Sequence, residues 1–295
     1  MSLPADLTRV LAEAGLEPGY VEDLVRAAVE EDLAGGVDVT SEATVPADQQ
    51  AAGDLVARAD GVVAGLAVAE ATFLSASNKP LDVAWQVADG DIVSAGTVLM
   101  TLTGPTRMLL LAERTALNLL CHLSGIATAT RRWADALAGT HAVVRDTRKT
   151  TPLLRPLEKY AVRCGGGDNH RMSLSDVALI KDNHLLAAGG ITAAYTAVSE
   201  AYPDLPVEIE VDSVEGAVEA AAAGAQLILL DNFTPPEVAQ AVHAVGGRSE
   251  LEVSGGLTIY AARAYGETGV DYLAVGAITH SAPALDIAFD LREVR

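Results

Sequence analysis

The segment VEIEVDSVEGAVEAAAAGAQLILLDNFTPPEVAQAVHAVGGRSELEVSGG, residues 207–256, decides the fold. It contains three short apolar runs that end in polar residues, at 207–211, 227–230 and 251–253, and Ala-rich stretches with helical period separate them. A fourth run follows at 272–275, so successive runs begin 20 to 24 residues apart. One strand and one helix fill that spacing, which predicts repeated βα units and a parallel sheet.

Repeated βα units form either an open doubly wound sheet or a barrel. A candidate site residue follows each predicted strand, namely Lys181, Glu210, Asp231, Ser254 and Gly276. An open sheet concentrates its site at one crossover point, whereas a barrel collects residues from many strand ends. We therefore predict an α/β barrel.

The first third of the chain has a different rhythm. A helical pattern occupies residues 20–33, alternating strand patterns occupy 51–59 and 81–87, and an Ala-rich helix lies between the strands at 67–76. Turn glycines between short β runs follow at 89–99 and indicate a tight antiparallel meander. These patterns predict a small α/β sandwich ahead of the barrel.

A long helical pattern from 105 to 137 connects the two regions. Ser124-Gly125 is expected to divide it into two helices, because glycine and serine weaken a helix interior. We place the domain boundary in this region, with a sandwich domain at 1–115 and a barrel domain at 116–282. Residues 283–295 are expected to return to the sandwich.

Cations are concentrated in residues 144–184, VRDTRKTTPLLRPLEKYAVRCGGGDNHRMSLSDVALIKDNH. This segment has eight Lys and Arg against five acids, a net +3, whereas the other 254 residues have 12 against 35, a net −23. One interpretation is a solvated helix face with local ion pairs. However, Arg148-Lys149 and Lys181 follow apolar runs, where surface charge is seldom placed, and this favours a focused anion-binding pocket.

The overall composition narrows the classes of partner. A net charge of −20 argues against nucleic acid, because phosphate backbones need a broad basic face. The first ten residues lack the apolar core of a signal peptide, and no apolar run approaches the roughly 18 residues of a membrane span. Two cysteines, Cys121 and Cys164, cannot build a disulfide framework. We therefore expect a cytoplasmic protein without nucleic-acid or membrane partners.

Two carboxylates follow consecutive predicted strands. Glu210 lies two residues after Glu208 on the same strand face, and Asp231 directly follows the run at 227–230. Acids in such positions often cap the next helix, an alternative that applies to both Asp212 and Asp231. Because an acid facing a cationic site has a chemical use, both interpretations stay open for Glu210 and Asp231.

Glycine turns follow the last two strands, at Gly255-Gly256 and Gly276. In barrels such turns bind phosphate through backbone N–H groups, although left-handed turns need glycine in any case. His170 and His184 are weak metal candidates, since the neighbouring cations repel a dication, and His170 is instead expected to bind an anion. The remaining histidines are expected to be structural or exposed: His122, His141, His243 and His280.

Motifs along nearly the whole chain, in order, resemble those of the quinolinate phosphoribosyltransferase family. They are ERTALN at 113–118, LSGIAT at 123–128, DTRKT at 146–150, EKYAVR at 158–163, GGG at 165–167, NHR at 169–171, LIKDNH at 179–184, EIEVD at 208–212, LDN at 230–232, SGG at 254–256 and VGA at 275–277. The combination is highly specific, although each motif alone is short.

The resemblance implies an N-terminal α/β sandwich followed by an incomplete α/β barrel of seven strands. It implies an enzyme that transfers phosphoribosyl from phosphoribosyl pyrophosphate (PRPP) to quinolinate with decarboxylation, giving nicotinate mononucleotide, pyrophosphate and CO₂ in de novo NAD biosynthesis. Mg²⁺ is the implied cofactor. The implied assembly is a homodimer, or a higher oligomer built from it, in which Arg114 reaches the partner subunit's site.

The resemblance also assigns roles to residues. Lys149, Lys181, Glu210 and Asp231 are the expected catalytic residues, and Glu210 and Asp231 are the candidates for direct or indirect metal contact. The expected substrate-binding residues are Arg114, Thr147, Arg148, Lys149, His170, Arg171, Lys181, Glu210, Asp231, Ser254, Gly255, Gly256, Val275, Gly276 and Ala277.

Two positions depart from the family pattern. Leu153 and Ser173 stand where the family usually has glycine, so the shape of these loops is expected to differ. Three other functions remain open on the residues alone: a nicotinate phosphoribosyltransferase, a Schiff-base aldolase that uses Lys181, and an anion-binding protein without catalysis.

Overall fold

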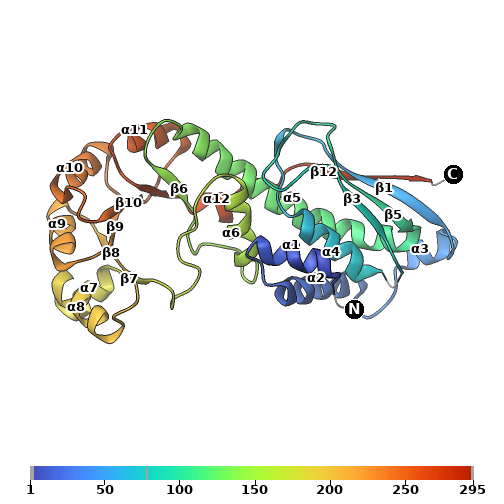
Figure 1. Ribbon diagram of the computed structural model, residues 1–295, viewed down its shortest axis with the longest axis horizontal. Coiled ribbons are helices and arrows are strands. Elements are labelled where there is room, and N and C mark those ends of the chain that lie inside the picture. The colour runs from blue at the N-terminus through green and yellow to red at the C-terminus, as the bar shows by residue number, and fades with distance from the viewer. Residues whose placement is uncertain (1–2, 78, 294–295) are drawn as a thin grey trace. The chain divides into compact units, whose positions relative to one another are not determined.

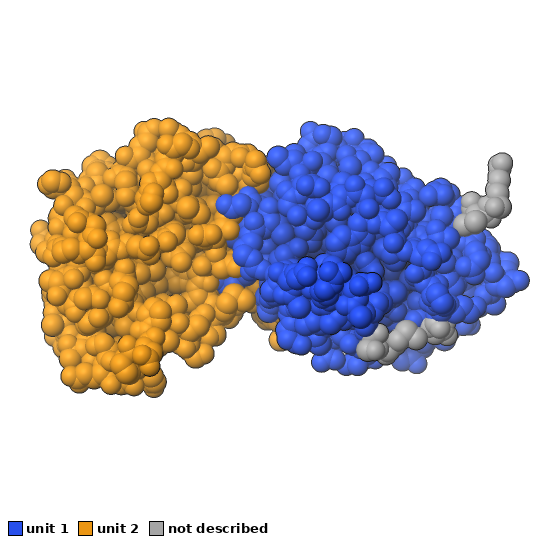
Figure 2. All heavy atoms as spheres, viewed as in Figure 1, with its two compact units in different colours: residues 1–129, 156–166, 282–295 blue, residues 130–155, 167–281 orange. Residues whose placement is uncertain are grey.

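The computed structural model describes residues 3–77 and 79–293, which form two compact units (Figure 2). The N-terminal unit takes in the chain up to residue 129, residues 156–166 and the chain from residue 282 onward. The barrel unit comprises residues 130–155 and 167–281. The domain boundary was predicted at 115/116, whereas these units divide between residues 129 and 130, within one continuous helix.

A four-stranded antiparallel sheet forms the centre of the N-terminal unit. Its order is β12 (Ile287–Glu293), β1 (Gln50–Ala57), β5 (Val98–Pro105) and β3 (Asp82–Trp85). A separate two-stranded ribbon pairs β2 (Gly61–Val62) with β4 (Ile92–Val93). The helices of this unit are α1 (Ala5–Glu13), α2 (Pro18–Leu33), α3 (Val39–Thr44), α4 (Leu66–Ala76), most of α5 (Thr106–Ala136) and, from residue 156 on, α6 (Arg155–Cys164).

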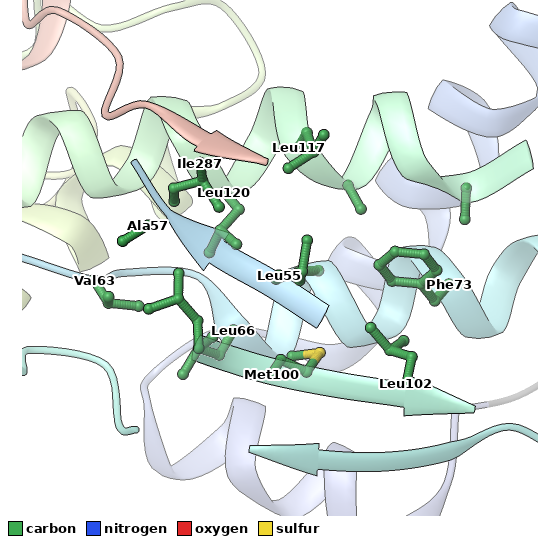
Figure 3. Close-up of a cluster of buried hydrophobic side chains, with 14 of the residues drawn as sticks. Leu55, Ala57, Val63, Leu66, Phe73, Met100, Leu102, Leu117, Leu120 and Ile287 are labelled. Atoms are coloured by element: carbon green, nitrogen blue, oxygen red, sulfur yellow. The ribbon is translucent and has the colours of Figure 1, made fainter. Parts of the chain in front are cut away.

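A hydrophobic core fills the space between this sheet and helices α4 and α5 (Figure 3). Leu55 and Leu102 point from the sheet, Phe73 from α4 and Leu120 from α5, and all four are fully buried. The ring centroids of Phe73 and of Phe289 on β12 are 5.6 Å apart. Because each large apolar side chain contributes about 1.5–3 kcal/mol on burial, this core holds the last strand to the early part of the chain.

Helix α5 is continuous, so the predicted division at Ser124-Gly125 is wrong. The hydroxyl of Ser124 accepts a hydrogen bond from the backbone N–H of Ala64 at 3.1 Å. A Cβ at position 125 would lie 2.2 Å from the carbonyl oxygen of Pro283. The glycine therefore allows a close backbone approach, a tertiary requirement that has the same sequence signature as a helix breaker.

Six parallel strands form the sheet of the barrel unit, in the order β6-β11-β10-β9-β8-β7 (Figure 1). The strands are β6 (Val143–Arg145), β7 (Ala178–Ile180), β8 (Val207–Val211), β9 (Leu227–Asp231), β10 (Glu250–Ser254) and β11 (Tyr272–Ala274). The helices of this unit are α7 (Asp182–Ala188), α8 (Ile191–Ala201), α9 (Val214–Ala223), α10 (Pro235–Val245), α11 (Ala262–Gly266) and α12 (Ala277–His280), with a 3-10 turn η1 (Ile259–Ala261).

The predicted βα repeat is confirmed, and the barrel is incomplete as expected. The described residues give six strands in this sheet where seven were expected. Beside β6, the segment after the Gly165–Gly167 turn makes only a single parallel bridge, between Asp168 and Arg145. Strands β6 and β7 are therefore the two edges of an open, curved sheet, and helices α8 to α11 lie along its outer side (Figure 1).

Candidate active site

The carboxyl ends of the parallel strands meet at one rim of the barrel sheet, because parallel strands all run in the same direction. Residues at and beyond these ends line a cavity of about 660 Å³. The cavity brings together all the predicted binding residues except Arg114: Thr147, Arg148, Lys149, His170, Arg171, Lys181, Glu210, Asp231, Ser254, Gly255, Gly256, Val275, Gly276 and Ala277. Arg114 is exposed on α5 and belongs to the N-terminal unit.

Four of the eight clustered cations line the cavity, namely Arg148, Lys149, Arg171 and Lys181. The Nε atom of Arg148 is buried and has no hydrogen-bond partner among the described residues. Burial, followed by the charge of Arg148, lowers the pKa of the Arg171 guanidinium. Two guanidiniums that disfavour each other's charge gain most from an anion bound by both, so this part of the cavity is suited to an anion.

The other four clustered cations have structural surroundings instead. Arg145 forms an ion pair with Glu252, and Arg155 donates hydrogen bonds to the loop that follows β6 and to the Met172 carbonyl in the segment before β7. Arg163 donates to the carbonyl at the end of α1, and Lys159 is fully buried in the N-terminal unit. The charge cluster of the sequence is therefore divided between the cavity and the scaffold.

The two carboxylates at the carboxyl ends of β8 and β9 line the same cavity as the cations. Glu210 is ion-paired with Lys181, and Asp231 accepts hydrogen bonds from Asn232 at 2.8 Å and from Ser254 at 3.3 Å. The helices that follow begin at other residues, since the N-caps are Ser213 for α9 and Thr234 for α10. The helix-capping alternative is therefore excluded for Glu210 and Asp231.

The two turns require glycine for different physical reasons. Gly255 has φ +93°, and a Cβ there would lie 2.1 Å from the side-chain oxygen of Asn232, so any side chain is excluded. Gly276 has an ordinary helical φ of −64°, but a Cβ would approach Lys149 Cδ at 3.1 Å and His280 Nε2 at 3.2 Å. The first turn needs glycine for its conformation and the second for space beside the cavity.

A charge cluster of Arg145, His170, Glu208 and Glu252, in which Arg145 is partly exposed and the other three are buried, lies against the cavity. His170 Nε2 is 2.9 Å from a Glu208 oxygen and 3.3 Å from a Glu252 oxygen, while Arg145 donates to Glu252 at 3.1 Å. His170 Nδ1 accepts the backbone N–H of Arg171 at 2.7 Å. Both ring nitrogens of His170 are thus engaged within the protein, which differs from the anion-binding role expected from sequence.

The spacing of this cluster is also that of metal ligands, since one atom from each of His170, Glu208 and Glu252 lies within 4.8 Å of the others. Arg145 already supplies a cation to Glu252, and a metal at Nε2 would leave the proton of the ring on Nδ1, against the Arg171 N–H. The cluster is therefore better suited to a proton than to a metal ion. His184 Nδ1 accepts the backbone N–H of Lys181 at 2.9 Å instead of joining the cluster.

Two polar residues of the cavity lining were missed in the sequence. Glu252 precedes Ser254 by two positions, as Glu208 precedes Glu210, so strand alternation carried a signal for it. His280 is exposed, as expected, and it also lines the cavity one helical turn after Gly276, which was not expected. No sequence signal marked this position, because it depends on α12, which begins directly after Gly276.

Family comparisons agree with the motifs. Residues 38–124 match the model of the quinolinate phosphoribosyl transferase N-terminal domain, and residues 126–290 match that of the C-terminal domain. The carboxylating nicotinate-nucleotide pyrophosphorylase of Mycobacterium leprae is 50% identical over 91% of this chain and 96% of its own length. The decarboxylating quinolinate phosphoribosyltransferase 1b of Nicotiana tabacum is 37% identical over 93% of this chain and 83% of its own length.

Solved structures show the same fold. NadC from Streptococcus pyogenes superposes with a TM-score of 0.91 at 39% identity, covering 95% of this chain and 99% of that one. The nicotinate-nucleotide pyrophosphorylase of Francisella tularensis gives a TM-score of 0.87 at 35% identity, covering 93% and 96% of the two chains. Human nicotinic acid phosphoribosyltransferase shares the fold at 15% identity and a TM-score of 0.58. None of the helices in residues 3–77 and 79–293 is long and apolar enough to cross a bilayer.

Proposed function

The chain belongs to the quinolinate phosphoribosyltransferase family, and we propose that the barrel cavity is the place where it carries out that reaction. The enzyme transfers the phosphoribosyl group of PRPP to quinolinate with decarboxylation, giving nicotinate mononucleotide, pyrophosphate and CO₂ for NAD biosynthesis. The observation that carries the assignment to the cavity is its composition. Cations, two carboxylates and two glycine turns converge there from six strands.

Quinolinate occupies the arginine side of the cavity in this proposal. It is a dianion with adjacent carboxylates, and guanidinium groups bind carboxylates with two parallel hydrogen bonds. Arg148 and Arg171 supply these groups from this chain, and the unpartnered Nε of Arg148 supports the assignment. Lys149 adds positive charge where quinolinate and PRPP meet, and His170 supports Arg171 from behind.

PRPP occupies the opposite side. The backbone N–H groups of the turns at Gly255-Gly256 and Gly276 receive its 5′-phosphate, since no side chain obstructs them. Lys149 and Lys181 bind the negative charge of the pyrophosphate. Glu210 must then exchange its ion pair with Lys181 for contacts with the ribose, so PRPP binding frees the Glu210 carboxylate from Lys181.

Glu210 and Asp231 stabilise the positive charge that develops on the ribose as pyrophosphate leaves, an electrostatic effect worth about 3–4 kcal/mol for one well-placed group. Their oxygen donors also fit Mg²⁺, which is a hard cation that prefers carboxylates and phosphates. When bound, Mg²⁺ would neutralise the charge of the departing pyrophosphate.

The decarboxylation follows from the first step. Once the ring nitrogen carries the ribose, its positive charge stabilises the electron pair that remains on C2 when the bond to the carboxylate breaks and CO₂ leaves. That carbon then takes up a proton. The protein's task is to hold the carboxylates in place and to shield them from water, so no covalent intermediate with the enzyme is needed.

The assembly and location are further parts of the proposal. Arg114 is exposed on α5, and we assign it to the quinolinate site of a second copy in a homodimer. Both cysteines are free, which is compatible with a reducing cytoplasm.

A single assay tests the proposal: CO₂ release from quinolinate, measured with and without PRPP and Mg²⁺. Release should require quinolinate and PRPP together, and omission of Mg²⁺ should reduce it. Asp231→Ala should slow glycosyl transfer roughly 10²–10³-fold, with a smaller change in KM for quinolinate. Equal turnover of nicotinate would favour a nicotinate phosphoribosyltransferase, and trapping of a substrate on Lys181 by borohydride would favour an aldolase.

A further inference from the structure

Glu208 is a buried carboxylate beside the cavity residue His170, and the proposed function gives it no role. It lies on β8 two residues before Glu210, so its side chain leaves the same face of the strand but further from the rim. Glu252 has the same relation to Ser254 on β10. Both carboxylates are fully buried, and burial of an unneeded carboxylate is costly, so a specific use is expected.

The geometry connects Glu208 to the cavity through His170. On one side, Nε2 of the ring lies 2.9 Å from Glu208. On the other side, Nδ1 accepts the backbone N–H of Arg171 at 2.7 Å. The imidazole ring is thus a rigid spacer between a buried carboxylate and the main chain that carries the Arg171 guanidinium.

The Arg171 guanidinium and the His170 backbone are also held by hydrogen bonds within the protein. The guanidinium Nη1 donates to the carbonyl oxygen of Val177 at 3.0 Å, and the backbone N–H of His170 donates to Asp146 at 2.9 Å. Asp146 is itself buried. The backbone around Arg171 is therefore held by two buried acids, one of which acts directly and the other through the imidazole ring.

The charges of the cluster balance when it holds one extra proton. Arg145 compensates Glu252, with which it is paired, and leaves Glu208 without a cation of its own. Burial raises the pKa of Glu208; burial by itself lowers the pKa of His170, but the two glutamates outweigh it and raise the pKa of His170 to about 9. One extra proton therefore stays on the Glu208–His170 pair at neutral pH. It lies on Glu208, because an Nδ1 that accepts the Arg171 N–H requires a neutral ring with its own proton on Nε2.

We propose that Glu208 is a positioning residue for quinolinate, acting through the His170 ring on the backbone of Arg171. This inference rests on the proposed function, in which Arg171 binds a quinolinate carboxylate. Glu208 itself touches neither substrate in this scheme. It sets the orientation of His170, and His170 sets the place of the Arg171 amide.

Glu208→Gln is the direct test, because it keeps the size of the side chain and removes its ionisable group. The KM for quinolinate should rise tenfold or more, whereas the KM for PRPP and the kcat at saturating quinolinate should stay within about threefold. Glu215→Gln on α9 makes the same chemical change at an exposed position and should leave all three constants unchanged. A Glu208→Gln enzyme with wild-type KM for quinolinate would overturn the proposal, as would equal losses for both substrates.

A measurement on the unmodified enzyme keeps the proposal testable if Glu208→Gln does not fold. The groups that face the His170 ring are Glu208, Glu252 and the Arg171 amide, with Arg145 behind Glu252. Because the pKa of His170 is raised, the extra proton of the pair is present below pH 9 and is lost as the pH rises through about 9. Calorimetric affinity for quinolinate should be constant from pH 7 to 8.5 and should fall as the pH approaches 10; constant affinity to pH 10 would contradict the proposal.

The two proposals fail differently. If the unmodified enzyme releases no CO₂ from quinolinate and PRPP, the proposed function fails. If it releases CO₂ but Glu208→Gln leaves quinolinate use unchanged, only the positioning role fails.

Discussion

Two largely buried regions of this protein hold opposite kinds of side chain. The core around Phe73 in the N-terminal unit is apolar, whereas the charge cluster of Arg145, His170, Glu208 and Glu252 in the barrel unit is ionisable. Burial stabilises the first by about 25 cal/mol per Å² of apolar area, but a buried charge costs free energy unless it is paired. The first region supports stability and the second supports function, so substitutions should separate the two effects.

The largest expected effect is on stability. Phe73→Ala removes a fully buried ring and should lower the free energy of unfolding by about 3–5 kcal/mol. Urea unfolding followed by circular dichroism measures the change, and kcat/KM below the transition should stay near the wild-type value. Phe73→Leu is the matched control and should lose less than half as much stability. An unchanged unfolding midpoint for Phe73→Ala would contradict the contrast between the regions.

Arg171→Ala should produce the opposite outcome. Loss of a charged group that pairs with a bound carboxylate costs about 2–5 kcal/mol, so kcat/KM for quinolinate should fall at least thirtyfold while the unfolding midpoint changes little. Arg131→Ala removes an arginine from an exposed pair with Asp135 on α5 and should change neither quantity. Wild-type kcat/KM in Arg171→Ala would show that the carboxylate assignment is wrong.

Arg155→Ala should affect both quantities moderately, because this residue connects scaffold and cavity. Its guanidinium donates to Thr150 at 2.9 Å, to the Met172 carbonyl at 3.0 Å and to the Arg148 carbonyl at 3.4 Å. Stability should fall by about 1–3 kcal/mol through the unsatisfied partners, and kcat/KM by roughly tenfold through a misplaced loop. Arg155→Lys keeps the positive charge but loses the planar set of guanidinium donors. If lysine restored wild-type stability and kcat/KM, the three hydrogen bonds of Arg155 would not be the cause of the losses.

The smallest effect concerns the loop that departs from the family pattern. Leu153 is 81% exposed and has φ +68°, a left-handed conformation that disfavours a side chain. Leu153→Gly should relieve about 1 kcal/mol of strain and raise the unfolding midpoint slightly, with kcat/KM unchanged. Leu153→Ala retains the Cβ and should give no such gain; a gain equal to that of glycine would mean that loss of exposed apolar surface, and not φ, is responsible.

Local patterns predicted most of the barrel unit correctly. The Ala-rich stretch of helical period between the first two runs contains α9 (Val214–Ala223), and the strand predicted at 207–211 is β8, because strand and helix periods are properties of neighbouring residues. The predicted helix break at Ser124-Gly125 was wrong. Glycine is needed at position 125 because the backbone of Pro283, 158 positions away in the chain, packs against it. The sheet has six described strands where seven were expected, because the segment beside β6 pairs with it through a single bridge, between Asp168 and Arg145.

By itself the sequence determined that cations gather in one segment, that polar residues follow apolar runs, and which family the motifs belong to. Only the tertiary structure decided which of those cations meet: Arg148 and Arg171 line the cavity, whereas Arg145 pairs with Glu252 and Lys159 is buried in the N-terminal unit. The physical reason is that spacing along a strand sets the face of a side chain but not its partner. The partners of His170 come from β8 and β10, which β9 separates, and only the folded sheet brings them within 3.3 Å of one ring.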